Sequence, residues 1–492
     1  MSVSTLNLTS LAPKITSLGV GSGLDLNSIV SQLVAVESQP MTQLQSAAST
    51  LQTTISDYGQ ISSLMNTLQT SASALANVTL WSQQSATSSN SGGVAVSVGS
   101  GAVSGNYAVS VQSLASAQTV ASASSYSSAG ATVGSGTLTF QLGAWDAAQA
   151  NFTPQSGSSS VSVAVTPTDT LQTISDKVNA LGLGVTASLV TDASGTRLAF
   201  TSTSTGSSNG FRIQAADDDG NNTDAGGLSA LAYDPASGTT GTVLGTAASN
   251  ATAIINGISV SSATNTLASA VPGLTLTLGQ VSATPVNIAV SANQASISSA
   301  ITTFVSSFNA LSSYLGTATA YDATTKTAGD LQGDNTANSL QRLLRANLSA
   351  TTGASSVFKT LSDVGLQFQR DGTISIDQPT LNSALNNLPE LKKAFTNIDT
   401  TTPGNNGLAQ NFVNFTQQAL GVNGLVTTAT SGLQAQLTDN GNQQSDLTNR
   451  ISAYQTTLVA QYTALDTQIA QLNALSSYVT QQLASITGTK TN

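Results

Sequence analysis

The densest group of side chains that could bind a cation lies near the middle of the chain. Four aspartates follow closely on one another there, with Gly220 and two asparagines between them: Asp217, Asp218, Asp219 and Asp224. Calcium takes oxygen ligands of this kind, but an EF-hand loop needs its glycine at a fixed position and a glutamate to close it. This segment meets neither condition. The pattern therefore predicts a solvated turn and no metal site.

A glycine-rich segment near the N-terminus could in principle hold a phosphate group. Gly19, Gly21 and Gly23 alternate with Val20 and Ser22. Phosphate-binding loops follow a strand and carry either Gly-Lys-Ser/Thr or the G-x-G-x-x-G spacing, and this segment has none of these features. We expect a flexible hinge that leads into a helix, and we expect no nucleotide or other cofactor.

Carboxylates are the remaining residues that could do acid–base chemistry, because the chain contains no histidine and no cysteine. Its two glutamates, Glu37 and Glu390, fall on predicted helices, while Asp363, Asp371 and Asp377 fall near predicted turns, where capping or solvation explains them. The absences remove imidazole and thiolate metal sites, the histidine-dependent nucleophiles and every disulfide. We therefore expect no enzymatic activity.

Charge excludes two further classes of partner. Only 7% of the residues are charged, the net charge is −10, and the 13 basic residues are scattered. Neither nucleic acid nor an anionic membrane is then an expected partner. No run of eighteen apolar residues predicts a membrane span, and residues 1–23 lack the basic and apolar regions of a secretory signal. The chain is expected to be cytoplasmic or to leave the cell without a cleavable signal.

The strongest pattern in the chain is an apolar seven-residue repeat over its last forty residues. One position of this repeat holds Ile451, Leu458, Leu465, Leu472, Val479 and Ile486. A second seam holds Leu447, Tyr454, Tyr462, Ile469, Leu475 and Leu483 and is interrupted by Gln461, Gln468 and Gln482. A period of 3.5 predicts a helix that winds around other helices. The glutamines favour contacts that form and exchange over a permanent zipper.

A matching pattern lies near the N-terminus, where Asp25 or Ser22 can cap a helix that ends before Pro40. Its apolar stripe comprises Leu26, Ile29, Val30, Leu33 and Val36. After Pro40 a seven-residue spacing relates Leu44, Leu51, Tyr58 and Met65, with Ile61, Leu68 and Leu75 on the adjoining seam. Both ends of the chain are therefore predicted to be long helices that pack on each other.

Between these ends the periodicity changes twice. From residue 82 to about 293 apolar residues alternate and Gly, Ser and Thr are dense, which predicts sheet sandwiches or barrels. One helix, capped by Thr170 or Asp169, and one hairpin, at 185–190 and 198–201, interrupt the pattern. Helices return at 297–315, 336–348, 378–388 and 408–420, with a hairpin at 368–376.

These elements predict an α+β multidomain protein. Its terminal heptad helices form a coiled-coil or helical-bundle stem, and β-rich domains are inserted in the middle. The expected domains are a terminal helical segment (1–40, paired with 448–492), a helical stem (41–90, packed with 290–447), a β-rich domain (91–115 with 246–289), an inserted β-rich domain (116–245), and a C-terminal coiled-coil helix (448–492).

Several stretches together resemble one family, the flagellar filament capping proteins of the hook-associated protein 2 type. The first stretch runs from Gly21 to Pro40 and includes Leu24-Asp25. The second includes Ala253–Ile258, Asn265 and Val271–Leu276, and the third is the terminal helix. Residues 170–213 are similar to a small repeat inserted in flagellins and hook-associated proteins, which we place near 158–215.

The resemblance implies a homo-oligomer, often of five subunits, at the distal tip of a bacterial flagellum outside the cell. It implies flagellin, hook-filament junction proteins, the flagellar type III export apparatus and an export chaperone as partners, and some members adhere to mucin. Helix surfaces are then the expected functional site. The residues expected to contact other subunits or the filament are Leu26, Ile29, Leu33, Leu44, Leu51, Ile451, Leu458, Leu465, Leu472, Val479 and Ile486.

Other readings of the sequence remain open at this point. Another axial flagellar protein, such as a flagellin or a hook-filament junction protein, would also have helical termini and few Cys or His. A secreted adhesin or phage fibre could be built from Ser/Thr/Gly-rich sandwiches, although such chains lack paired heptad termini.

Overall fold

The structure is a computed structural model that describes residues 25–488, with side chains up to residue 485. The chain divides into two compact units. One unit is residues 82–293, and the other combines the residues before 82 with those after 293. We call residues 25–81 with 294–488 the helical unit and residues 82–293 the β unit. The β unit coincides with the region where the sequence period changes to two. The predicted α+β organisation, with helices at both ends and sheets between, is confirmed.

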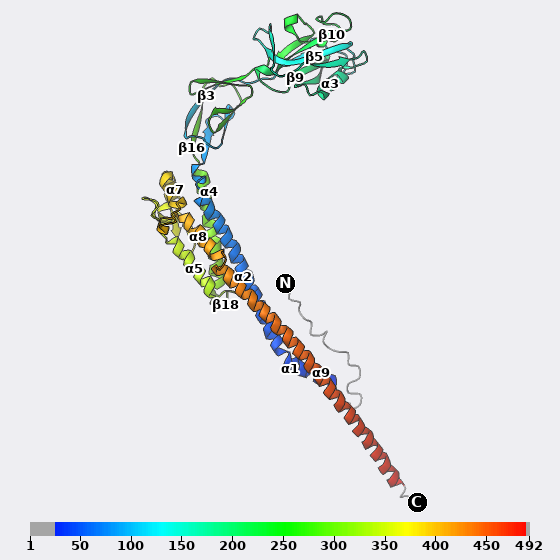
Figure 1. The fold of residues 1–492 in the computed structure, drawn as a ribbon, viewed down its shortest axis with the longest axis vertical. Coiled ribbons are helices and arrows are strands. Elements are labelled where there is room, and N and C mark those ends of the chain that lie inside the picture. Colours follow the sequence, from blue (N-terminus) through cyan, green and yellow to red (C-terminus); the bar gives the residue numbers. More distant parts are fainter. Residues whose placement is uncertain (1–24, 489–492) are drawn as a thin grey trace. The chain divides into compact units, whose positions relative to one another are not determined.

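The helical unit contains eight α-helices within the described residues and two short hairpins (Figure 1). The helices are α1 (Leu26–Glu37), α2 (Gln39–Ala76), α4 (Gln294–Thr319), α5 (Asn335–Leu348), α6 (Gln378–Leu385), α7 (Leu388–Thr396), α8 (Leu408–Leu420) and α9 (Leu425–Gly488). The hairpins are β17 (Tyr321–Asp322) with β18 (Thr327–Ala328), and β19 (Leu366–Phe368) with β20 (Ile374–Ile376).

Local sequence explains where the first helices begin. The Asp25 carboxylate accepts the Ser28 N–H at 3.0 Å and so caps α1. Pro40 lies in the first turn of α2, where its missing N–H leaves no hydrogen bond unmade. The Asp334 carboxylate accepts the Ala337 N–H at 2.8 Å at the start of α5, and it also accepts the Tyr58 hydroxyl at 2.6 Å. Burial, and then this second bond, raise the pKa of Tyr58.

The core of the helical unit forms where α2, α4 and α8 pack together (Figure 1). The α2 heptad supplies Tyr58, Ile61, Met65, Leu68 and Leu75, all fully buried. Aromatic rings fill the space opposite: Phe412 on α8 meets Phe304 edge-on at a centroid distance of 5.1 Å and Phe308 at 6.0 Å. From Tyr58 onward, the heptad residues of α2 are therefore buried in this core.

The β unit is built from sixteen strands and one α-helix. The strands are β1 (Gln84–Ser88), β2 (Val94–Val98), β3 (Gly105–Ser113), β4 (Thr119–Ser122), β5 (Gly136–Trp145), β6 (Phe152–Pro154), β7 (Val161–Val165), β8 (Val185–Asp192), β9 (Gly195–Ser202), β10 (Gly210–Asp217), β11 (Thr242–Thr246), β12 (Ala251–Ile255), β13 (Ile258–Ser262), β14 (Thr266–Val271), β15 (Leu274–Leu278) and β16 (Val286–Ala292). The helix is α3 (Leu171–Ala180).

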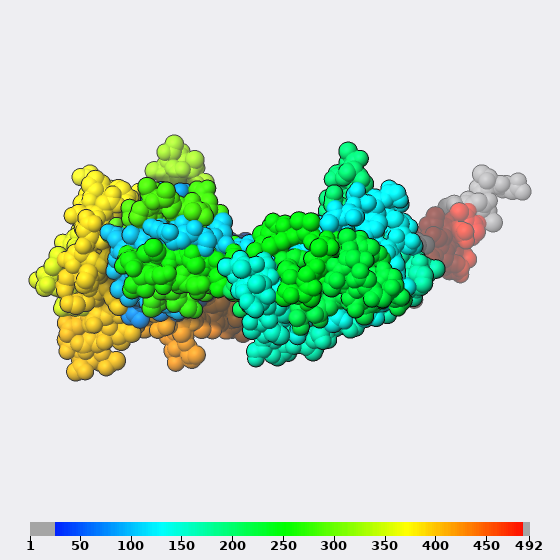
Figure 2. Space-filling view, turned by 90° about the horizontal axis from the view of Figure 1, so that it is seen from above, coloured from blue at the N-terminus to red at the C-terminus, as the bar shows by residue number. Residues whose placement is uncertain are grey.

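Two cores divide these strands. The first lies between a five-stranded sheet, in the order β1-β16-β3-β12-β13, and a three-stranded sheet, β14-β15-β2. The second joins the sheet β11-β4-β9-β8, the sheet of β10, β5, β6 and β7, and α3. Figure 2 shows the blue and green segments interleaved on the surface, as expected where early strands pair with late ones such as β1 with β16 and β3 with β12.

Most predicted local elements agree with the structure. Thr170, not Asp169, caps α3, in a reciprocal capping box with Thr173. The predicted hairpins at 185–201 and 368–376 are present as β8–β9 and β19–β20. Residues 19–23, the glycine-rich segment, lie outside the described residues.

Three predictions need correction. The helix expected at 378–388 ends at Leu385, because the chain turns at Asn386–Asn387, and a further helix that was not expected, α7, begins at Leu388 with Pro389 in its first turn. The C-terminal helix begins at Leu425, well before the heptad becomes regular. The stem boundaries at 90 and 290 are wrong, since residues 84–88 and 286–292 pair as β1 and β16. The Ser/Thr composition of residues 84–88 gives no apolar alternation that would have marked a strand.

Candidate assembly surface on the terminal helices

The helix α9 is packed along its first part, residues 425–458, which we call the proximal segment. It contacts α1, α2, α5 and α8. Near its end, Leu447 and Ile451 are buried with Met41 in a small cluster that Val34 and Leu44 join from the side. This cluster fixes the N-terminal helices to α9 outside the main core, as the paired heptads predict.

An ion pair lies beside this cluster. The Arg450 Nη2 atom is 2.9 Å from the Glu37 carboxylate, and Nε donates to the same oxygen at 3.1 Å. Both side chains are partly exposed, so the pair adds little stability. Its position sets register: Glu37 at the end of α1 meets Arg450, and Met41 at the start of α2 is clustered with Leu447, so the chain that runs from α1 into α2 is antiparallel to α9.

Beyond Leu458 the same heptad continues, and most of its apolar residues are exposed, although Tyr462 and Ile469 are half-buried. We call residues 459–485 the distal segment of α9. Leu458 is 7% exposed, but Leu465 is 42% and Leu472 is 63% exposed, and Leu475, Val479 and Leu483 are also exposed in the described structure. At 1.5 Å per residue the apolar stripe from Leu465 to Leu483 is about 27 Å long. A contiguous exposed stripe of this kind is typical of an interaction surface.

The predicted contact residues separate into groups. Leu26, Ile451 and Leu458 are buried within the subunit, and Leu33, Leu44 and Leu51 are half-buried. Leu465, Leu472 and Val479 are exposed, as is Ile29 at 37%. The side chain of Ile486 lies outside the described residues. The structure brings only Leu44 and Ile451 into one cluster. Residues 1–40 were predicted to pair with residues 448–492, and within the described residues this is wrong for most of the distal segment.

Sequence reasoning missed Val34 and Met41 as packing residues and missed the Glu37–Arg450 pair. A signal for the pair existed, because Arg450 is the only basic residue between Leu425 and Gly488. A lone basic residue on a heptad helix indicates a carboxylate on the neighbouring helix. Val34, Met41 and Ala48 are spaced by seven residues across Pro40, so a seven-residue signal for these packing positions also existed.

The acidic cluster is a turn in which three of the four carboxylates, those of Asp217, Asp219 and Asp224, accept hydrogen bonds from nearby residues. Asp217 Oδ2 accepts the Ser229 N–H at 2.7 Å, and Asp219 Oδ1 accepts the Asn221 N–H at 2.8 Å. Asp224 accepts the Ser229 hydroxyl at 2.7 Å, and this bond is the main cause that lowers the pKa of Asp224. Among the described residues no group of three or more acidic side chains is arranged to hold a metal ion.

The carboxylates weighed for catalysis have structural partners. Lys393 pairs with Glu390 at 2.7 Å, and this pair, followed by the Ser355 hydroxyl, lowers the pKa of Glu390 to about 2. Asp371 accepts the Thr373 N–H within its hairpin, and Asp363 accepts the N–H groups of Lys359 and Thr360. Within residues 25–488, no helix combines the length and apolarity needed to cross a membrane.

Comparison with known proteins identifies the family of the chain. Residues 22–118 match the model of the flagellar hook-associated protein 2 N-terminus, and residues 248–474 match that of its C-terminus. The A-type flagellar hook-associated protein 2 of Pseudomonas aeruginosa is 30% identical over 493 residues, covering 97% of this chain and 99% of that protein. Flagellar hook-associated protein 2 of Escherichia coli is 28% identical over 490 residues, covering 97% and 99%.

The fold agrees with this match. A crystal structure of the D1-D2-D3 domains of the flagellar cap protein FliD from Escherichia coli superposes with a TM-score of 0.55 at 26% identity. It covers 77% of this chain and 99% of that one. The expected resemblance is confirmed over both terminal regions, and the chain belongs to the flagellar hook-associated protein 2 family, the flagellar cap proteins.

Proposed function

We propose that this protein forms the cap at the distal tip of a bacterial flagellar filament and that exported flagellin folds and inserts beneath it. The cap acts as a structural assembly, without catalysis, and prevents the loss of exported subunits. The observation that carries the proposal is the division of α9 into a packed proximal segment and an exposed distal segment. A helix with an uncovered heptad stripe is built to associate with other helices.

The same observation supports the proposed partners. Copies of this chain can cover one another's distal stripes, since a ring of identical subunits presents identical helices to its neighbours. The filament lies below such a ring, with flagellin and the hook-filament junction proteins as neighbours. Export through the flagellar type III apparatus with a chaperone on α9 suits the stripe, which needs cover before assembly. The proposed domains follow the corrected boundaries, with residues 114–250 as an inserted domain.

The proposed contact residues are those that the structure leaves available. Leu465, Leu472 and Val479 on the distal segment, with Ile486 next in the same register, contact other subunits or the filament. Leu26, Leu44, Leu51, Ile451 and Leu458 hold α1 and α2 beside α9 so that the distal segment projects from a fixed base. Ile29 and Leu33 extend the contact surface on α1.

A truncation tests the proposal. Residues 459–492 are removed, so the cluster of Met41, Leu447 and Ile451 is retained. Cells that carry this truncated protein as their only copy are expected to grow no filaments and to release flagellin into the medium. The purified truncated protein is expected to keep its thermal unfolding temperature, which controls for misfolding. Filaments of normal length on such cells would contradict the proposed function.

A further inference from the structure

The face of α9 that packs on α2 is polar over one heptad of the proximal segment. Its two seam positions there hold Asn440 and Gln444, whereas the neighbouring seam positions hold Leu433, Leu437, Leu447 and Ile451. The Gln444 Nε2 atom donates to Asn440 Oδ1 at 2.6 Å, and Asn440 is only 8% exposed. The seam therefore carries an amide pair at a place where apolar side chains would hold two helices together.

The stretch of α2 opposite this pair is also poor in apolar packing. Met41 clusters with Leu447 in an antiparallel arrangement, so Ala48, seven residues later on α2, lies opposite Asn440, seven residues earlier on α9. Ala48 is the only buried residue between Leu44 and Tyr58, and residues 51 and 55 are half-buried. Solvent reaches this stretch through a hollow that Asp330 lines together with Ser46, Ser49, Thr50, Thr53 and Thr54.

Two separate apolar cores flank this polar region. On one side the main core of the helical unit includes Tyr58 of α2 and Val426 of α9. On the other side Met41, Leu447 and Ile451 form the small cluster. Along α2, Leu44 and Tyr58 are about 21 Å apart at 1.5 Å per residue. We call residues 45–57 with 438–446 the polar joint, and residues 26–44 with 447–485 the arm.

The sequence also weakens α9 itself within the polar joint. Residues 438–446 contain no apolar side chain and read Thr-Asp-Asn-Gly-Asn-Gln-Gln-Ser-Asp. Among the described residues, a Cβ added to Gly441 would meet no neighbouring atom within 4 Å, so no close packing requires glycine there. Glycine inside a helix adds backbone freedom, and Asn, Asp, Ser and Thr are weak helix formers. This stretch therefore has neither strong helix preference nor apolar packing to keep it straight.

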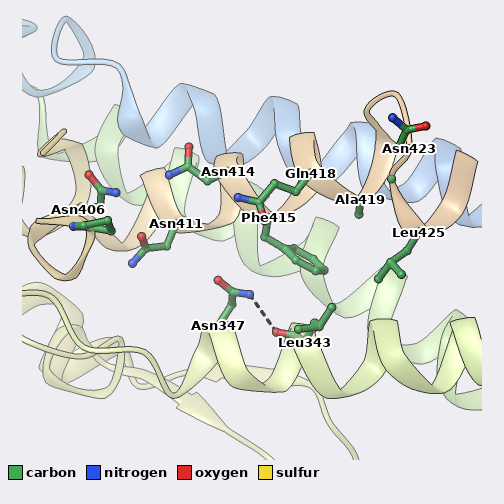
Figure 3. A pocket seen from close by; sticks show the side chains of 12 residues that line it. Leu343, Asn347, Asn406, Asn411, Asn414, Phe415, Gln418, Ala419, Asn423 and Leu425 are labelled. Atoms are coloured by element: carbon green, nitrogen blue, oxygen red, sulfur yellow. Dashed lines mark hydrogen bonds between the residues drawn. The ribbon is translucent and has the colours of Figure 1, made fainter. Parts of the chain in front are cut away.

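The start of α9, in contrast, is held on several sides. Figure 3 shows Phe415 of α8 and Leu425 of α9 projecting toward α5 beside an open hollow. Val426 is buried in the main core, and the Thr427 hydroxyl donates to the Leu420 carbonyl at 2.9 Å. If α9 bends, the place where it leaves α8 is therefore fixed, and the polar joint is the weakest section of its proximal segment.

We propose that the polar joint is a hinge at which the arm bends relative to the rest of the helical unit. Bending there leaves both apolar cores intact, and water can replace the amide contact that is lost. The small cluster and the Glu37–Arg450 pair carry α1 along with α9, so the arm moves as one piece. The hinge is a property of the single subunit and goes beyond the proposed function, in which it would let the distal stripe change direction without unpacking the core.

Distances between two spin labels test the hinge in the purified full-length protein. The chain contains no cysteine, so Gln434→Cys and Ala453→Cys place one label at an exposed position on each side of residues 438–446. A straight helix separates these two Cα atoms by about 28 Å. Double electron–electron resonance is expected to show a broad distribution that extends to shorter distances. A single narrow distance for the labelled protein would overturn the proposal.

Matched variants of the labelled protein assign the bending to the seam. Asn440→Leu with Gln444→Leu restores the apolar heptad and is expected to narrow the distance distribution. Asn442→Leu with Ser445→Leu is the control, because both residues lie in the same stretch but are exposed and off the seam. The control should keep the broad distribution. Equal narrowing by both pairs, or narrowing by neither, would overturn the assignment of the hinge to the polar seam.

Amide hydrogen exchange gives a test that needs no substitution. Amides of residues 438–446 are expected to exchange at least about tenfold faster than those of residues 426–433 and 447–458 on either side. Equal protection would overturn the hinge and would make the amide pair an ordered contact that only aligns α2 with α9. Neither result bears on the proposed function, which the truncation tests separately.

Discussion

The proximal and distal segments of α9 share one heptad pattern but differ in what covers it. In the proximal segment Leu447 and Ile451 are buried against Met41, and in the distal segment Leu472 and Val479 are exposed. The periodicity is the same because the apolar face of each segment packs against a helix, within the subunit for the proximal segment and, as we propose, in another subunit or the filament for the distal segment. The difference shows that a heptad pattern fixes which face packs and leaves the identity of the partner to the rest of the chain.

The largest expected effect comes from charges in the distal stripe. Leu472→Asp with Leu475→Asp should abolish self-association while leaving thermal unfolding unchanged. Each leucine would contribute about 1.5–3 kcal/mol when buried in a partner, and an unpaired carboxylate in that place is costly. Sedimentation velocity measures the oligomer. Ala474→Asp with Ser477→Asp, on the opposite face, is the matched control, and an equal loss in the control would break the comparison.

Shortening a side chain in the proximal segment should lower the stability of the subunit itself. Ile451→Ala is expected to destabilise the packing of α1 on α9 by about 2–3 kcal/mol, toward the lower end for a buried isoleucine because the cluster is small and can relax. Amide hydrogen exchange in α1 and the thermal unfolding temperature report this loss. Leu472→Ala is the comparison, and it should change neither. Similar destabilisation by both would show that the distal stripe is also packed within the subunit.

The three glutamines of the distal segment can be replaced to increase the apolar contact between subunits. Replacing Gln461, Gln468 and Gln482 with leucine extends the second seam, and subunit exchange should slow by at least about tenfold, since burying even one leucine is worth more than 1.4 kcal/mol. Exchange is measured by mixing two fluorescently labelled pools, and filament growth should slow with it. Unchanged exchange and growth would refute a role for the glutamines in reversible contact.

Acid should destabilise the core of the helical unit through Glu390 on α7. The pKa of Glu390 is lowered to about 2 in the folded protein, against about 4.3 unfolded, so its contribution to stability is present above about pH 4.3 and is lost as the pH falls toward 2. The unfolding temperature should therefore fall less between pH 5 and pH 3 in Glu390→Gln than in the unsubstituted protein. Asp439→Asn, an exposed carboxylate on α9, is the control and should follow the unsubstituted protein.

Much of the fold could be predicted because local patterns were strong. The heptads of α2 and α9, the Thr170 cap and the β8–β9 hairpin all follow from spacing and turn chemistry. The strand at residues 84–88 could not be found, since it has no periodic signal and depends on tertiary pairing. The start of α7 did have a local signal, because Pro389 lies in its first turn. For the assembly surface, the periodicity identified which residues of α9 form the seam. It could not show that burial of this seam falls off after Leu458, because that depends on how far α1 extends along α9.

The pairing of β3 with β12 brings together the two ends of the segment between them. The chain leaves along β3 and returns along β12, which pair directly, with Ser113 opposite Thr252. The residues between β3 and β12 can vary while the pairing of these two strands is kept. The two family models match on either side of residues 119–247. If residues 114–250 form an inserted domain as we propose, replacing them should leave the pairing of β3 with β12 in place, with contacts such as Thr205 to the Ala263 carbonyl to be rebuilt.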